Sequence, residues 1–285
     1  MKSSVSIFGS NNIAMELALE YARNNCQVCI YSLDMHALLK VEDVIKSVMG
    51  NNNEISINLN QTLENIKIFH YNNAIIDGVE ELSEARYVIV ITEENLDENI
   101  KILHMLSEIV SENTIIFTNT LGMTVGKLSR EYKFPNRLCG IQLMSRIFAM
   151  ENVGIVKTIL TDEFAIIKAE EMINLINKNV VILPDRPGFV IGKVLLMFIV
   201  EAMRIVEQQI ASHHDIDKII RLGMNIPKGP LQIADDIGLD IVHSSLNYIY
   251  EETKDYKYRP CKLLNDMVIT GNLGRKSNKG FYNYD

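Results

Sequence analysis

Residues 185–210 read DRPGFVIGKVLLMFIVEAMRIVEQQI and divide the chain into two kinds of structure. Pro187 and Gly188 break the chain at the start of this stretch, because proline favours a first turn over a helix interior. The following residues are apolar on nearly every side, and such a helix is buried all round or lies in a membrane. Lys193 and Glu201 leave the apolar run too short for a membrane span. We therefore predict a central helix, covered by its own domain on one side and by a second copy of the chain on the other.

Upstream of this helix, short apolar strands alternate with helical segments, which predicts a doubly wound parallel α/β sheet of the Rossmann type. We expect strands at residues 4–8, 27–31, 66–69, 87–91, 114–118, 138–143, 155–159 and 180–183. We expect helices ending at residue 22 and spanning 34–48, 96–110 and 163–175, with a polar asparagine-rich loop at 50–60.

Downstream of Pro187 the sequence shows only helical periodicity, broken at residues 223–229, at Gly238 and at 271–274. We therefore expect two domains. Residues 1–184 should form the Rossmann-like sheet domain, and residues 185–285 should form an all-α domain.

Composition narrows the functional classes. A net charge of -8 argues against binding to nucleic acid or to an anionic membrane. The N-terminus has no signal-peptide pattern, so we expect a cytoplasmic protein. Cys26 and Cys29 have a C-x-x-C spacing but belong to a predicted strand, and we favour buried thiols over a redox pair. We assign no metal site.

The turn after the first strand is the place for a dinucleotide, and such turns read G-x-G-x-x-G. Gly9 keeps the first glycine, Asn11 replaces the second, and Ala14 is an accepted substitute for the third. The Asn11 side chain takes up space that the pyrophosphate needs. A carboxylate that binds the ribose is expected at the end of the second strand. That position holds Ser32, and Asp34, two residues later, is a possible substitute. The residues that we assign to cofactor binding here are Gly9, Ser10, Asn12, Ile13 and Ser32.

Five motifs occur in order in the second half of the chain: DRPGFV at 185–190, NIPKGPL at 225–231, ADDIGLD at 234–240, YRP at 258–260 and GRKSNKGFY at 274–282. Together they resemble the 3-hydroxyacyl-CoA dehydrogenase family in its short bacterial 3-hydroxybutyryl-CoA form. The resemblance continues upstream through residues 94–95, 118–120 and 140–141. It implies NAD-dependent oxidation of a 3-hydroxyacyl-CoA by a dimer. Residues 1–184 would then be the NAD-binding domain, in a degenerate form, and residues 185–285 the domain for dimerisation and substrate binding. The resemblance also implies substrate contact by Asn225 and cofactor contact by Glu94, Asn119 and Lys276.

Three positions depart from the family pattern. The family's general-base histidine is Gln142 here, an amide that cannot exchange a proton near neutral pH. The glutamate that orients this histidine is Gly154, and the serine that binds the substrate hydroxyl is Leu121. Of the four catalytic groups that the resemblance implies, Asn225 alone is kept.

Other residues offer little replacement for the missing base. Among the histidines, His243 alone lies near a matched motif of the helical domain, and we favour a packing role for it. Lys276 equally suits a solvated loop, and Glu94 equally suits a helix N-terminus. The arm that contacts CoA in the family is short here and holds asparagines at 51–53.

We therefore expect a family member that is catalytically impaired or inactive, with weak or absent NAD binding. It would act as a homodimer that binds a CoA thioester or assembles with an active family partner. The alternative is an active NAD-dependent oxidoreductase that uses an unrecognised base on a 3-hydroxyacyl-CoA or a related 3-hydroxy acid.

Overall fold

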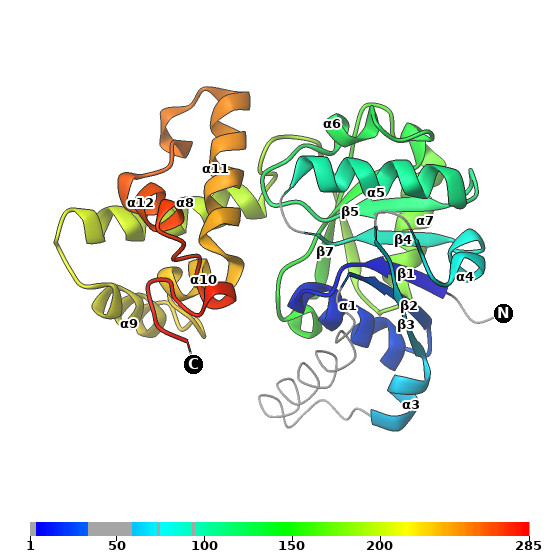
Figure 1. Cartoon of the computed structure of the whole chain (residues 1–285), viewed down its shortest axis with the longest axis horizontal. Coiled ribbons are helices and arrows are strands. Elements are labelled where there is room, and N and C mark those ends of the chain that lie inside the picture. The colour runs from blue at the N-terminus through cyan, green and yellow to red at the C-terminus, as the bar shows by residue number, and fades with distance from the viewer. Residues whose placement is uncertain (1–3, 34–58, 73–74, 93–94, 285) are drawn as a thin grey trace. The chain divides into compact units, whose positions relative to one another are not determined.

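A computed structural model describes residues 4–33, 59–72, 75–92 and 95–284, which form two compact units (Figure 1). The sheet unit consists of Met1–Thr120 with Thr124–Asp185. The helical unit consists of Arg186–Asp285 and also takes the short segment Leu121–Met123. The chain therefore enters the helical unit briefly before it completes the sheet unit.

The described part of the sheet unit contains one eight-stranded sheet in the order β3-β2-β1-β4-β5-β6-β7-β8. Its strands are β1 (Ser4–Phe8), β2 (Gln27–Ser32), β3 (Ile66–His70), β4 (Tyr87–Val90), β5 (Ile115–Thr118), β6 (Leu138–Gln142), β7 (Asn152–Lys157) and β8 (Asn179–Pro184). The predicted doubly wound sheet is confirmed, with β1 at the point where the strand order reverses.

One part of the sheet differs from the prediction of parallel strands. β7 pairs antiparallel with β6, and β8 pairs parallel with β7. The reason is the connection between β6 and β7, which holds only the 3₁₀ turn η2 (Ile147–Ala149) and no crossover helix. A parallel neighbour needs a long crossover, whereas a short connection returns the chain in the opposite direction.

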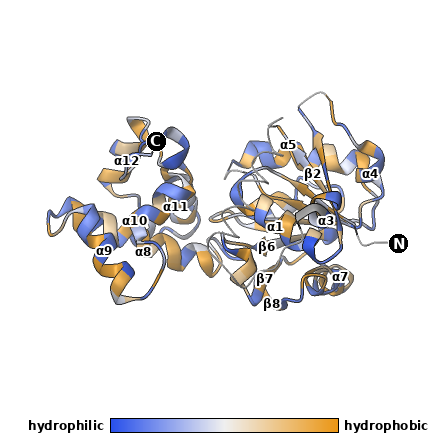
Figure 2. Cartoon of the chain, turned by 90° about the horizontal axis from the view of Figure 1, so that it is seen from below, coloured by the Kyte–Doolittle hydropathy of each residue, from blue (hydrophilic) through white to orange (hydrophobic). Residues whose placement is uncertain are grey.

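Helices cover both faces of the sheet. Side chains of α1 and α7 pack with Val5, Ile7 and Ile30 in the main core cluster, and α5 lies on the opposite side of the sheet from α7 (Figure 2). The described helices of this unit are α1 (Asn12–Arg23), α3 (Leu59–Glu64), α4 (Val79–Ser83), α5 (Leu96–Ile109), α6 (Val125–Ser129) and α7 (Glu163–Asn174). The predicted helix at 34–48 and most of the predicted loop at 50–60 lie outside the described residues.

The helical unit packs around α8. Leu196, Ile199, Val200 and Met203 on α8 are fully buried, whereas Val194 is 68% exposed. The helices are α8 (Ile191–Glu207), α9 (His213–Gly223), α10 (Pro230–Ile237), α11 (Leu239–Thr253) and α12 (Lys262–Ile269). In the ranges that the structure describes, no helix is both long and apolar enough to cross a membrane.

Candidate functional site

The turn between β1 and α1 requires glycine at one position. Gly9 has φ 132°, and a Cβ there would lie 2.1 Å from the carbonyl oxygen of Ile91. The Gly9 N–H donates to the Tyr31 oxygen of β2 at 2.9 Å. A side chain at residue 9 would therefore push β1 away from the residue after β4, which explains why the first glycine of the motif is kept.

Asn11 occupies the N-terminus of α1. Its backbone is extended (φ -74°, ψ 171°), so no positive φ is needed at this position. Its Oδ1 accepts a hydrogen bond from the Ala14 N–H at 3.0 Å, and its Nδ2 lies 3.4 Å from the Ile91 oxygen. The helix N–H groups that would hold a pyrophosphate are thus partly capped by the protein's own amide. Of the neighbouring assigned residues, Asn12 is exposed, whereas Ser10 and Ile13 are half-buried.

Ser32 ends β2, where a dinucleotide-binding sheet places its ribose carboxylate. It pairs with His70 of β3 and is only 1% exposed. A buried hydroxyl presents no charge to a ribose. Gly9 therefore fits a dinucleotide, whereas the capping Asn11 side chain and the buried Ser32 do not. Asp34 and Glu94 lie outside the described residues.

Gln142 and Gly154 are direct cross-strand partners in the antiparallel pair of β6 and β7. Gln142 is the last residue of β6 and is 4% exposed. A Cβ built at Gly154 would lie 3.2 Å from the Gln142 Cβ and 3.0 Å from Leu183 Cδ1. The residues that stand at the histidine and glutamate positions of the resemblance therefore contact each other, and neither carries a titratable group.

The Asn119 side chain contacts the backbone at Leu143, the first residue after β6. Its Oδ1 accepts from the Leu143 N–H at 2.9 Å, and its own N–H donates to the Val90 oxygen at 2.9 Å. The neighbouring Thr118 is 2% exposed, and its Oγ1 finds no hydrogen-bond partner among the described residues. Asn119 therefore positions the backbone next to Gln142, a role that its place in the sequence did not reveal.

Leu121 belongs to the helical unit rather than to the sheet unit that precedes it. Its side chain packs against the core of the helical unit, and its carbonyl oxygen lies 2.1 Å from a Cβ built at Gly192. The adjacent Gly122 oxygen accepts from the Gly188 N–H at 2.8 Å. Leucine at 121 therefore serves packing, where the resemblance expects a hydroxyl that binds substrate.

The remaining predicted residues of the helical unit have structural partners or surface positions. Asn225 is exposed, with φ 52° just after the end of α9, a left-handed position that favours asparagine or glycine. Lys276 donates to Asp240 Oδ2 at 2.5 Å. His243 bonds to the side chains of Asn247 and Asn265.

The thiols show no sign of activation. All four cysteines are free and buried, as favoured above for Cys26 and Cys29. Burial raises the pKa of Cys29 to about 11, which keeps it a neutral thiol near neutral pH. Within the described ranges, no group of three or more His, Cys, Asp or Glu side chains could hold a metal ion.

Two buried carboxylates were missed by sequence reasoning. Asp217 accepts from the Leu231 and Gln232 N–H groups at 2.9 and 2.8 Å, and so caps α10. Asp235, fully buried, accepts from the Phe281 and Tyr282 N–H groups at 3.0 Å each. Both carboxylates therefore hold the fold, and no signal in the sequence separates them from surface acids.

Comparisons with known proteins match both units. The family model described as "3-hydroxyacyl-CoA dehydrogenase, NAD binding domain" matches residues 4–186, and the model of the C-terminal domain of the same family matches residues 188–284. A probable 3-hydroxybutyryl-CoA dehydrogenase of Bacillus subtilis is 34% identical over 212 residues, 74% of each chain. The 3-hydroxybutyryl-CoA dehydrogenase of Clostridioides difficile is 33% identical over 72% of this chain and 73% of its own.

Solved structures agree over the full length. Mycobacterium tuberculosis FadB2 superposes with a TM-score of 0.84 at 27% identity, covering 99% of this chain and 98% of its own. The (S)-3-hydroxybutyryl-CoA dehydrogenase PaaH1 of Ralstonia eutropha superposes with a TM-score of 0.81 at 28% identity, covering 100% of both chains.

Proposed function

Because the chain belongs to the 3-hydroxyacyl-CoA dehydrogenase family, we propose that it is a member that has lost hydride transfer and acts as a binding or assembly subunit. The observation that carries this proposal is the cross-strand pair Gln142 and Gly154. These two positions correspond to the base and its orienting carboxylate in the resemblance, and they face each other across β6 and β7. A neutral amide opposite a glycine can neither accept the hydroxyl proton nor stabilise the resulting positive charge.

The serine that the resemblance expects to bind the substrate's hydroxyl group is also replaced, by Leu121. At that position the partly buried Leu121 side chain packs against the core of the helical unit. Asn225 remains as an exposed amide that could contact a substrate carbonyl, but an amide supplies no proton transfer. A CoA thioester therefore stays a candidate ligand without being a substrate for oxidation.

Binding of NAD should be weak or absent, and binding of NADP no stronger. The Asn11 cap competes with the pyrophosphate, and Ser32 offers no carboxylate to the ribose. Each change removes about 1–3 kcal/mol by analogy with lost charged hydrogen bonds. Together they weaken binding roughly 30-fold to 10⁴-fold.

The assembly that we propose is a homodimer through the helical unit, in the cytoplasm, with an active family member as an alternative partner. Support comes from apolar side chains on the outside of this unit, including Ile219 at 65% and Leu222 at 66% exposure. These two residues lie one turn apart on α9 and share a face.

The direct experiment is an assay of acetoacetyl-CoA reduction by NADH. Loss of a general base costs about 10²–10⁴-fold, and groups that act as a unit do not simply multiply. We expect a turnover below about a ten-thousandth of a typical kcat near 10 s⁻¹. Robust turnover by the unmodified chain would instead favour the alternative, an active oxidoreductase with another base.

A restored variant tests the assignment of the pair. Gln142→His and Gly154→Glu need to be made together, because the Gln142 side chain is a nearest neighbour of any new Cβ at 154. Leu121→Ser, Asn11→Gly and Ser32→Asp complete the variant. We expect activity to rise above the unmodified chain, whereas the same variant without Gln142→His should stay inactive. Equal rates for the two variants would contradict the proposed role of residue 142.

A further inference from the structure

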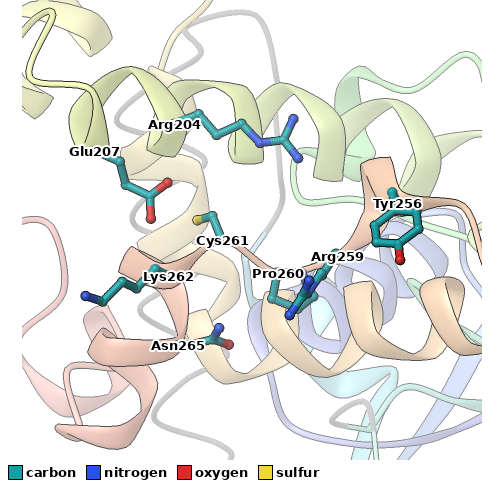
Figure 3. Close-up of a pocket in the computed structure, with 8 residues that line it drawn as sticks. All are labelled: Arg204, Glu207, Tyr256, Arg259, Pro260, Cys261, Lys262 and Asn265. Carbon is teal, nitrogen blue, oxygen red and sulfur yellow. The ribbon is translucent and has the colours of Figure 1, made fainter.

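A pocket of about 410 Å³ lies in the helical unit, between α8, the 3₁₀ turn η3 (Tyr256–Tyr258) and the start of α12. It contains Arg259 and Pro260 of the YRP motif, for which the proposed function has no use. The residues that line it are Arg204, Glu207, Tyr256, Arg259, Pro260, Cys261, Lys262 and Asn265 (Figure 3).

The charge of this pocket is unbalanced. Three cationic side chains, Arg204, Arg259 and Lys262, share it with a single carboxylate, Glu207. Glu207 Oε1 already accepts from the Leu263 N–H at 2.6 Å, at the positive end of α12. Figure 3 shows the Arg204 guanidinium directed away from Glu207, toward the side of the pocket that holds Tyr256. Arg204 is already engaged, because its Nη1 lies 3.4 Å from Glu201 Oε2 and its Nη2 donates to the Lys257 oxygen at 3.3 Å. Arg259 and Lys262 outnumber Glu207, so the pocket keeps a net positive charge in a chain that is acidic as a whole.

The lining amide is oriented as a donor. Asn265 Oδ1 lies 2.8 Å from His243 Nε2, and because a carbonyl oxygen can only accept, this nitrogen carries the imidazole proton. Asn247 Nδ2 lies 3.2 Å from His243 Nδ1 and 3.3 Å from Nε2, and with the proton on Nε2 the acceptor is Nδ1. Because the Asn265 oxygen is used by His243, the NH₂ group of Asn265 is the part of this side chain that can bind a ligand. Guanidinium, ammonium and amide groups thus make the pocket rich in donors.

We propose that this pocket binds a phosphate monoester. A phosphate offers three charged acceptor oxygens, which match arginine forks and an amide donor. The pocket also has an apolar side, since Pro260 and Tyr256 line it and Tyr256 is 72% exposed. An organic group on the phosphate would cover this side, so an ester is favoured over the free ion. The proposal goes beyond the proposed function and does not depend on it.

The experiment is calorimetric titration of the full chain with phenyl phosphate and with inorganic phosphate at constant ionic strength. Phenyl phosphate should bind saturably and more tightly than inorganic phosphate. Arg259→Gln and Lys262→Gln should each weaken it roughly 10- to 100-fold, the effect of one lost charged hydrogen bond. Lys218→Gln, which removes an exposed cation from α9 outside the pocket, is the matched control and should leave affinity unchanged.

Several results would overturn the proposal. One is the absence of saturable binding up to about 10 mM phenyl phosphate, which corresponds to less than about 3 kcal/mol of affinity. Equal affinity for phenyl phosphate and inorganic phosphate would exclude the ester. Equal weakening by Lys218→Gln and Arg259→Gln would show that binding depends on the net charge of the chain and not on this pocket. If Arg259→Gln instead converted a dimer to a single chain, the pocket would hold a carboxylate of a second copy.

Discussion

A single side chain, that of Asn11, occupies the N-terminus of α1. Asn11 caps the helix through Ala14, so it stabilises the element whose free N–H groups a dinucleotide would use. Asn11→Gly should therefore cost the fold only a few tenths of a kcal/mol while it strengthens NAD binding, whereas Asn11→Ala should cost about 1 kcal/mol. Thermal unfolding and calorimetric titration measure both effects. A Gly variant with unchanged affinity for NAD would show that the cap is not what limits binding.

Two residues at this scale illustrate where prediction from sequence ends. The resemblance alone predicts that Gln142 stands at the family's histidine position and Gly154 at its glutamate position, because both are matched by their place in the sequence. That the two contact each other depends on the register of β6 against β7, which is set by tertiary pairing. The packing of Leu121 into the helical unit likewise follows from contacts with Gly192, far away in sequence.

Among the elements, the C-terminal segment depends on one carboxylate. Asp235 on α10 accepts from two N–H groups and from the Tyr284 hydroxyl, and a Cβ at Gly280 would lie 2.0 Å from Asp235 Oδ1. The glycine of the GRKSNKGFY motif is thus needed for close approach to this side chain. Asp235→Asn would turn an NH₂ group toward these donors and should lower the free energy of unfolding by about 1–3 kcal/mol.

The pH dependence of this effect has a definite sign. Burial, opposed by the hydrogen bonds from Phe281, Tyr282 and Tyr284, raises the pKa of Asp235. A raised pKa in the folded state means that stability from this group is present below its unfolded pKa of about 3.9 and is lost as pH rises through the folded pKa. Asp235→Asn should therefore be more destabilising near pH 4 than near pH 7. Denaturant unfolding at the two pH values measures this, with Asp266→Asn at an exposed position on α12 as control.

The elements themselves were largely predictable, since buried parallel strands read as apolar runs bounded by polar turns. The direction of β7 was not, because residues 143–151 contain no strong signal that distinguishes a short return from a crossover helix. The expected breaks near residue 223 and at Gly238 coincide with the ends of α9 and α10, where Gly238 takes φ 102°. Capping by Asp217 was not predictable, because its partners lie on a different helix.

For the whole molecule, the proposed dimer gives the clearest test. An obligate interface should bury upward of about 2,000 Å². Light scattering at micromolar concentration should give twice the 32.4 kDa of one chain. Ile219→Glu with Leu222→Glu should reduce this to one chain, because two buried charges would face the partner. Ile269→Glu, at an 82% exposed position on α12, is the control. A single-chain mass for the unmodified protein would rule the dimer out.

The small segment Leu121–Met123 limits how this molecule can exchange parts with its relatives. In the sequence it lies between the two segments of the sheet unit, but it packs with Gly188, Gly192 and Ser245 of the helical unit. A single genetic crossover near residue 185 would join a helical unit to a foreign version of this segment. Because a Cβ at residue 192 would collide with the Leu121 oxygen, a donor with a side chain there would not fit. Working chimeras of the two units should therefore require residues 121–123 and 186–285 to be inherited from the same parent.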